Sequence, residues 1–247
     1  MPKLFNEFTN TRGVIVYGGE ASSDYGMVIA EAPTFERPKR KATVYNVPGR
    51  NGAVVFQEDA WEDVTRSYTV WLSTHQDQDL AASVDSFEAW LNSCKSWNRL
   101  EDNFEPDVFR LAYYEGGDSF TNNLTQYGEA TLNFRCRPER FYKYGETPIS
   151  VTNGSKIYNK TRFTSKPLIH IEGTGSIALS IGGKTITATV TDYINIDTET
   201  MNAYRLPAEN KNDKISGSFP TIAPGDNTIG LTGSASLVTI TPRFFTI

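Results

Sequence analysis

Few side chains of this sequence stand in a pattern that could do chemistry. The chain contains two histidines, His75 and His170, and two cysteines, Cys94 and Cys136. Two cysteines give neither a disulfide framework nor the paired spacing of a zinc site. Both lie at apolar-facing positions, so we expect buried free thiols. The motifs of serine hydrolases, zinc proteases, phosphate-binding loops and EF-hands are absent. We therefore predict that the protein is not an enzyme and has no cofactor and no metal site.

Two weaker patterns depend on a structural context. Glu101/Asp102 and Asp77/Asp79 are acid pairs that could serve a glycosidase or a metal ion, but only the fold can place such carboxylates. Residues 173–178 (GTGSIA) fit the relaxed dinucleotide-binding pattern, which requires a helix directly after it. An alternating run follows instead and ends at Gly182-Gly183, so we interpret the segment as a β-turn.

Composition and charge narrow the class of protein. Charged residues make up 21% of the chain, hydrophobic ones 38%, and the net charge is -5, which is typical of a soluble globular protein. Basic and aromatic residues lie close together within residues 134–145, where bases could stack on the rings. Because the chain as a whole lacks a basic footprint, we instead interpret these rings as covering a junction between two domains. The sequence shows no membrane-spanning run and no signal peptide, so we expect folding in a reducing cytoplasm.

The predicted secondary structure changes near Pro138, from strands with one helix before it to short strands alone after it. Before it, one apolar stripe at helical period predicts a helix over residues 78–93, with Asp77 or Asp79 at its N-terminus. Pro138 cannot donate to a sheet ladder, so we expect it to end a strand or confine it to an edge. The strand-like runs of this half are residues 14–17, 27–30, 42–47, 53–56, 65–73, 108–114, 120–125 and 130–135. The first half is therefore predicted to be α+β.

The second half consists of short strands separated by turns. A two-residue Gly182-Gly183 turn joins two alternating runs and predicts a hairpin. The strand-like runs are residues 167–172, 176–181, 184–190, 193–197, 201–206, 214–219, 227–232 and 235–241. Short strands at this spacing, with no helix between them, predict a β-sandwich or a jelly roll. The predicted fold class of the whole chain is mainly β.

Short patterns across most of the chain resemble one protein family. In the first half they are residues 47–52 (VPGRNG), Trp90-Leu91 followed by Lys95, Trp97 and Arg99-Leu100, 109–112 (FRLA) and 134–138 (FRCRP). In the second half they are residues 165–169 (SKPLI), 173–175 (GTG), 194–197 (INID), 203–204 (AY), 217–220 (GSFP), 224–229 (PGDNTI) and 242–243 (PR). In order and spacing these resemble the distal tail (Dit) proteins of bacteriophages with long, non-contractile tails.

The resemblance implies two domains. Residues 1–147 would form a split β-barrel-like belt with one helix, which assembles as a homohexameric ring around the channel through which DNA passes. Residues 148–247 would form a galectin-like β-sandwich. The ring would join the tail tube to tail-tip or baseplate proteins, such as a tail-associated lysin and a receptor-binding protein. The implied location is the virion tail tip, after assembly in the host cytoplasm, with no membrane and no specific nucleic acid as partner.

A hairpin tip is the candidate contact site of such a ring. Residues 48–52 (PGRNG) separate two strand-like runs, and Asn-Gly is a strong hairpin signal because both residues tolerate positive φ. Arg50 could pair with a carboxylate of a neighbour through two hydrogen bonds. We predict that Gly49, Arg50, Asn51 and Gly52 contact a second subunit or the tail tube.

The alternative function is a carbohydrate-binding sandwich that contacts the host cell wall. Sugar sites favour an exposed aromatic platform, and the second half contains Tyr, Phe and His170 but no Trp. The chain is also too short to hold an inserted carbohydrate-binding module. The sequence therefore favours a structural role over sugar binding.

Overall fold

The computed structural model describes residues 13–73, 80–117, 121–123 and 127–247. The chain divides into two compact units, Met1–Arg140 with Ile247 and Phe141–Thr246. The predicted boundary after residue 147 and the ring-forming role of the first domain remain predictions.

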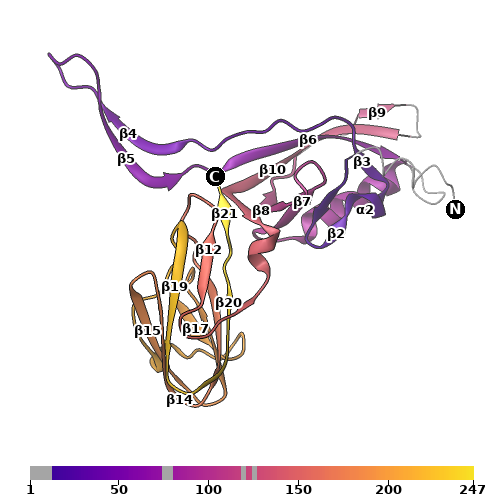
Figure 1. Cartoon of the computed structure of the whole chain (residues 1–247). Helices are drawn as coiled ribbons and strands as arrows, with labels where there is room; N and C mark the ends of the chain where they lie inside the picture. Colours follow the sequence, from indigo (N-terminus) through magenta and orange to yellow (C-terminus); the bar gives the residue numbers. More distant parts are fainter. Residues whose placement is uncertain (1–12, 74–79, 118–120, 124–126) are drawn as a thin grey trace. The chain divides into compact units, whose positions relative to one another are not determined.

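The described part of the first unit contains a curled sheet, the helix α2 and one separate hairpin (Figure 1). The strands of the curled sheet follow the order β2-β1-β7-β8-β10-β6-β3, and β9 pairs with β10. Their bounds are β1 Ile15–Tyr17, β2 Glu20–Ala21, β3 Met27–Ile29, β6 Val64–Ser73, β7 Asn98–Asp102, β8 Val108–Tyr114, β9 Thr121–Asn123 and β10 Tyr127–Tyr142. The helix α2 spans Leu80–Ser93, and a short 3-10 helix, η1, spans Ser22–Tyr25. The separate hairpin consists of β4 Arg40–Tyr45 and β5 Val54–Trp61.

The alternation along the strands and the helical period of α2 together account for the core of the first unit. In β6, Tyr68, Val70 and Leu72 share one face and are fully buried, as the alternation predicts. The predicted helix is confirmed, and its apolar stripe is buried at Phe87 and Leu91. The predicted capping residues of this helix, Asp77 and Asp79, lie outside the described residues, and so does His75.

The predicted effect of Pro138 is wrong in part. Strand β10 does not end there, because it continues to Tyr142. Its pairing with β6, however, ends where Cys136 faces Val64. Pro138 therefore lies beyond the β6 ladder, where its missing N–H removes no bond to that strand.

The two thiols differ in burial. Cys136 is buried, as predicted, and burial raises the pKa of its thiol to about 12. Cys94 is only half-buried, so the prediction of a buried thiol is wrong there. It directly follows Ser93, the last residue of α2, and so lies at the end of the apolar stripe of the helix.

The second unit is a sandwich of two antiparallel five-stranded sheets. One sheet has the order β11-β20-β13-β16-β17 and the other β12-β19-β14-β15-β18. Their bounds are β11 Ile149–Ser150, β12 Lys156–Asn159, β13 Leu168–Gly173, β14 Gly175–Ile181, β15 Lys184–Val190, β16 Tyr193–Asp197, β17 Asn202–Tyr204, β18 Ile215–Gly217, β19 Gly225–Thr232 and β20 Ala235–Thr241. Short elements complete it: η2 Lys143–Glu146, η3 Asn212–Lys214 and β21 Phe245–Thr246.

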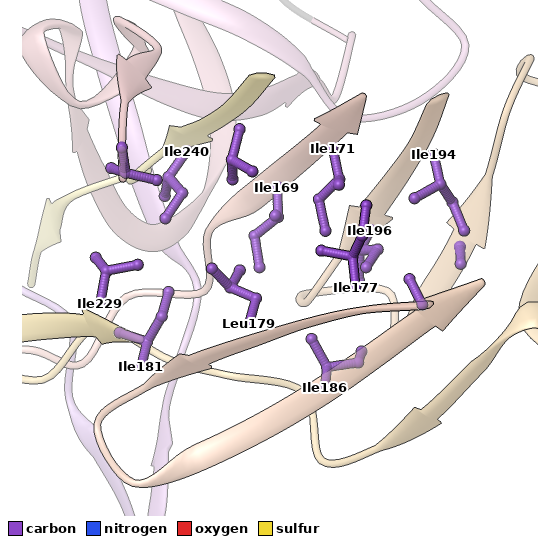
Figure 2. Packing of buried hydrophobic residues seen from close by; sticks show 14 of the residues in the cluster. Ile169, Ile171, Ile177, Leu179, Ile181, Ile186, Ile194, Ile196, Ile229 and Ile240 are labelled. Atoms are coloured by element: carbon purple, nitrogen blue, oxygen red, sulfur yellow. The ribbon is translucent and has the colours of Figure 1, made fainter. Parts of the chain in front are cut away.

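Isoleucine dominates the core of this sandwich. Figure 2 shows Ile169 and Ile171 of β13 together with Leu179 of β14, and each of the three is fully buried. Alternate residues of each strand point inward, which is the pattern that predicted the sandwich. The turn expected within residues 173–178 is confirmed only at its start, because β13 ends at Gly173 and residues 175–178 already belong to β14. The predicted mainly β fold class is confirmed.

Candidate interface on the β4–β5 arm

Strands β4 and β5 form a two-stranded sheet of their own, which we call the arm (residues 40–61). Figure 1 shows it extending away from the curled sheet of the first unit. The strands are antiparallel, with Tyr45 opposite Val54, Val44 opposite Val55, and Thr43 opposite Phe56. Every residue of β4 is exposed. An isolated two-stranded hairpin is marginally stable in water, and the other described residues do not cover the strands of the arm.

Apolar side chains project from both faces of the arm. Residues directly opposite one another share a face, so Val44 and Val55 lie on one face and Tyr45 and Phe56 on the other. Their exposed fractions are 57%, 52%, 56% and 60% respectively. The rings of Tyr45 and Phe56 pack edge to face, with centroids 5.7 Å apart. Full burial of such a side chain contributes about 1.5–3 kcal/mol, so a partner would gain considerable free energy here.

The predicted contact residues form the tip of the arm. Gly49, Arg50, Asn51 and Gly52 are all exposed, and the backbone N–H of Arg50 donates to the carbonyl oxygen of Val47 at 3.2 Å. Gly49 and Gly52 have φ of 79° and 81°, a left-handed conformation that favours glycine. Asn51 does not have positive φ, because the connection is longer than the two-residue turn that Asn-Gly predicted. The structure thus brings the four residues together, and their contact role remains a prediction.

The two strands of the arm carry opposite charge near its base. Arg40 and Lys41 belong to β4 and follow Arg37 and Lys39, although Glu36 also lies in this segment. On β5 the charged residues are Glu58 and Asp59, and Glu62 and Asp63 follow the strand. Most of these side chains are exposed. The arm therefore has one basic strand and one acidic strand.

A few specific contacts hold the two strands of the arm together at its base. The N–H of Glu62 donates to the carbonyl oxygen of Lys39 at 2.9 Å. Arg40 donates to Gln57 at 3.2 Å, and its guanidinium lies 5.0 Å from the centroid of the Trp61 ring. A shallow polar pocket of about 380 Å³ lies at this base, lined by Lys41, Glu62, Asp63, Val64, Thr65, Glu115 and Arg135.

A buried ion pair holds the segment that leads into the arm. The guanidinium of Arg66 donates to the carboxylate of Asp102 at 2.9 Å and to the carbonyl oxygen of Thr34 at 2.8 Å. Tyr68 donates its hydroxyl to the same Asp102 oxygen at 2.7 Å. The side chains of Arg66 and Asp102 are 3% and 1% exposed, so removal of either partner would leave an uncompensated buried charge.

This network also determines the protonation of Asp102. Burial alone would raise the pKa of its carboxyl group, but the hydrogen bond from Tyr68 and the charge and hydrogen bond of Arg66 outweigh that effect. The pKa of Asp102 is therefore below its ordinary value, and the carboxylate stays ionised. An ionised carboxylate that accepts four hydrogen bonds, two of them from the backbone of Phe104 and Glu105, is a structural group rather than a general acid.

The other side chains singled out in the sequence are also engaged. Glu101 pairs with Arg99 in β7. His170 lies on the outer face of β13, where its ring contacts the oxygens of Asn195 at 2.8 Å and Glu172 at 3.1 Å. Within the described ranges, no group of three His, Cys, Asp or Glu side chains could hold a metal ion. None of the helices among the described residues is long and apolar enough to cross a membrane.

Sequence reasoning missed the apolar faces of the arm. The sequence did contain an indication. Val44 and Tyr45 are adjacent, as are Val55 and Phe56, so apolar side chains occur on both faces of each strand. Such a pattern indicates a strand covered on both faces. The arm has no such cover within the described chain.

No protein-family model matches the chain, and no curated protein matches its sequence. Among solved structures, the Dit protein of phage SPP1, described as a paradigm of the hub adsorption apparatus in phages that infect Gram-positive bacteria, aligns with a TM-score of 0.73 and 13% identity. The alignment covers 95% of this chain and 99% of that protein.

Two structures of the phage p2 baseplate in its activated conformation also match. The structure with Sr gives a TM-score of 0.52 at 10% identity, and the structure with Ca gives 0.53 at 11% identity. Each alignment covers 93% of this chain and 97% of the baseplate chain. The described chain thus has, over nearly its whole length, the fold of a phage distal tail protein.

Proposed function

We propose that this chain is a structural protein of a bacteriophage tail, located in the hub or baseplate. The observation that carries the proposal is the match to SPP1 Dit over nearly the full length of both chains. The matches to phage p2 baseplate chains support the same location in the virion. We assign it no catalytic role, because the candidate acids Glu101 and Asp102 are occupied by Arg99 and Arg66.

We further propose that six copies form a ring around a channel for DNA. A closed ring requires a heterologous interface, in which two different patches of the same chain meet. The arm supplies an exposed apolar surface of the kind that an oligomer would cover. The net charge of -5 suits a channel wall past which DNA slides, since a basic wall would retain it.

The solution mass of the purified chain tests the ring, together with negative-stain images of the same fraction. We expect a mass six times the 27.5 kDa of the chain and a six-fold ring with an open centre. A chain that stays monomeric both alone and after mixing with the tail tube protein would contradict the ring.

The proposed ring joins the tail tube to the proteins of the tail tip, such as a tail-associated lysin and a receptor-binding protein, after assembly in the host cytoplasm. We expect negative-stain images to show rings at one end of tail tubes mixed with this chain. Rings that bind neither tubes nor tip proteins would contradict the proposed position in the virion.

One observation favours sugar binding as a second candidate function. The outer face of β13 and β16 carries His170, Glu172, Tyr193 and Asn195, and the ring of Tyr193 lies 5.5 Å from that of His170. Amide, carboxylate and imidazole groups on one sheet face can bond sugar hydroxyls. Binding of the full chain to purified host cell wall, lost in Asn195→Ala but kept in the exposed control Thr189→Ala, would support this function. Equal binding by both variants would exclude this face.

A further inference from the structure

The arm presents two open strand edges that differ in charge. Among the described strands, β4 pairs only with β5, so the outer edge of each strand carries unpaired backbone groups. Such edges are templates for pairing with another chain, and natural proteins normally cover or shorten them. Here β4 is six residues long, β5 eight, and both lie in an exposed ribbon.

We propose that the arms of neighbouring copies pair edge to edge, with β4 of one copy beside β5 of the next. This inference rests on the proposed ring and identifies its interface. The occupant of each open edge is the arm of a second copy of this chain, and the contact repeats around the ring. Because the two edges differ, the interface is heterologous and closes only through cyclic symmetry.

Charge supports this pairing. When two arms lie side by side at the same height, the register used inside the arm is repeated between copies. Lys41 then lies beside Glu58 and Asp59 of the neighbour, and the preceding Lys39 lies beside its Glu62. Opposite charges on adjacent strands stabilise pairing, and like charges directly opposite destabilise it.

The apolar residues support the same register. In this register, Val44 of one copy lies beside Val55 of the next. Tyr45 lies beside Val54, on the face of the arm that also carries Phe56. The apolar rows on both faces of the arm thereby continue from copy to copy, which one isolated hairpin cannot achieve.

The charges also exclude the competing arrangement. Two copies whose arms point the same way and meet through their β4 edges would place Lys39 and Lys41 against the same residues of the other copy. Two β5 edges would bring Glu58 and Asp59 together in the same way. Both symmetric dimers are repelled, so the head-to-tail direction is selected.

Charge reversal of one strand at a time tests the pairing in the full-length chain. The β4 variant is Lys39→Glu with Lys41→Glu, which makes both strands acidic. The β5 variant is Glu58→Lys with Asp59→Lys, which makes both strands basic. Arg40 is left unchanged because it bonds Gln57 inside the arm. The matched control is Lys160→Glu with Lys184→Glu, two exposed lysines of the second unit.

We expect each one-strand variant to raise the concentration of half-assembly about tenfold or more, while the control assembles like the wild type. An equimolar mixture of the two one-strand variants is expected to restore rings, because acidic and basic arms then alternate. Far-UV circular dichroism establishes that every variant is folded before its mass is measured.

The outcomes separate the pairing from the ring itself. One-strand variants that assemble like the wild type, or a mixture that fails to restore rings, would overturn the edge pairing and leave the proposed hub function standing. A wild-type chain that stays monomeric with and without the tube protein would overturn the ring, and the edge pairing with it.

Discussion

The arm and the β14–β15 hairpin are built from the same parts but differ in what covers them. Both are antiparallel pairs with glycines in positive-φ turns and with β-branched and apolar residues along the strands. In β14, Ile177 and Leu179 are fully buried against the opposite sheet, whereas Val44 and Val55 of the arm are more than half exposed. The local sequence thus specifies a hairpin in both places, and only the second sheet turns one of them into a stable core.

The largest expected effect concerns charges that are paired inside the chain. Asp102→Ala should destabilise the first unit by about 3–5 kcal/mol, because it leaves Arg66 buried without its partner. Asp59→Ala in the arm should change the free energy of unfolding by less than about 0.5 kcal/mol. All four Trp precede residue 98, so urea unfolding followed by Trp fluorescence reports on this unit.

Tyr68→Phe provides a milder variant if Asp102→Ala does not fold. It removes one hydrogen bond to Asp102 and should cost about 1–2 kcal/mol. Equal sensitivity of Asp102 and Asp59 would contradict the contrast between the body and the arm.

The same ion pair predicts a dependence on pH. The pKa of Asp102 in the folded chain is lowered, so its contribution is fully present above the ordinary carboxyl pKa of about 3.9 and is lost as the pH falls through the folded value. Glu105, whose pKa is also lowered, acts in the same direction. We expect the stability of Asp102→Ala to fall less steeply in acid than that of the wild type; parallel curves would contradict this origin.

Apolar truncation compares the two hairpins directly. Leu179→Ala should destabilise the second unit by about 2–5 kcal/mol, because it leaves a cavity in a fully buried layer. Val55→Ala should leave the unfolding of the monomer unchanged within about 0.5 kcal/mol and weaken assembly instead. Far-UV circular dichroism during thermal unfolding measures the first effect, and light scattering measures the second. A large loss of monomer stability in Val55→Ala would show that the arm is covered within its own chain.

The smallest effect concerns the turns. Gly183 and Gly49 have φ of 78° and 79°, and a Cβ at either would meet open space. Gly183→Ala should therefore cost about 1–2 kcal/mol through backbone strain alone, in a hairpin that is part of a cooperative unit. Gly49→Ala carries the same strain, but the arm is not part of the core, so the main unfolding transition should not move. Equal shifts of the transition would mean that the arm unfolds together with the body.

Local periodicity predicted most of the fold. The alternation of β14 and β15 and the Gly182-Gly183 turn are visible in the sequence, and so is the stripe of α2. Strands β7, β11 and β12 were not predicted, because they are short or lack alternation. Their pairing depends on neighbours that are distant in sequence.

The candidate site was predicted only in part. The tip residues Gly49 to Gly52 follow from turn chemistry, which is local. The apolar faces of the arm, its two charged edges and the ion pair of Arg66 with Asp102 depend on which strands lie next to one another. The residues 66 and 102 belong to β6 and the end of β7, and no local pattern links them.

The difference between the basic β4 edge and the acidic β5 edge of the arm has a consequence for the kinetics of assembly. In the proposed arrangement, every open chain of subunits keeps one free edge at each end, so it can always grow or lose a terminal copy. The copy that closes the ring makes two contacts at once, and the second forms at the high effective concentration of a tethered pair. Closed rings would therefore persist at concentrations where open intermediates dissociate, and a solution should contain single copies and complete rings with little between them.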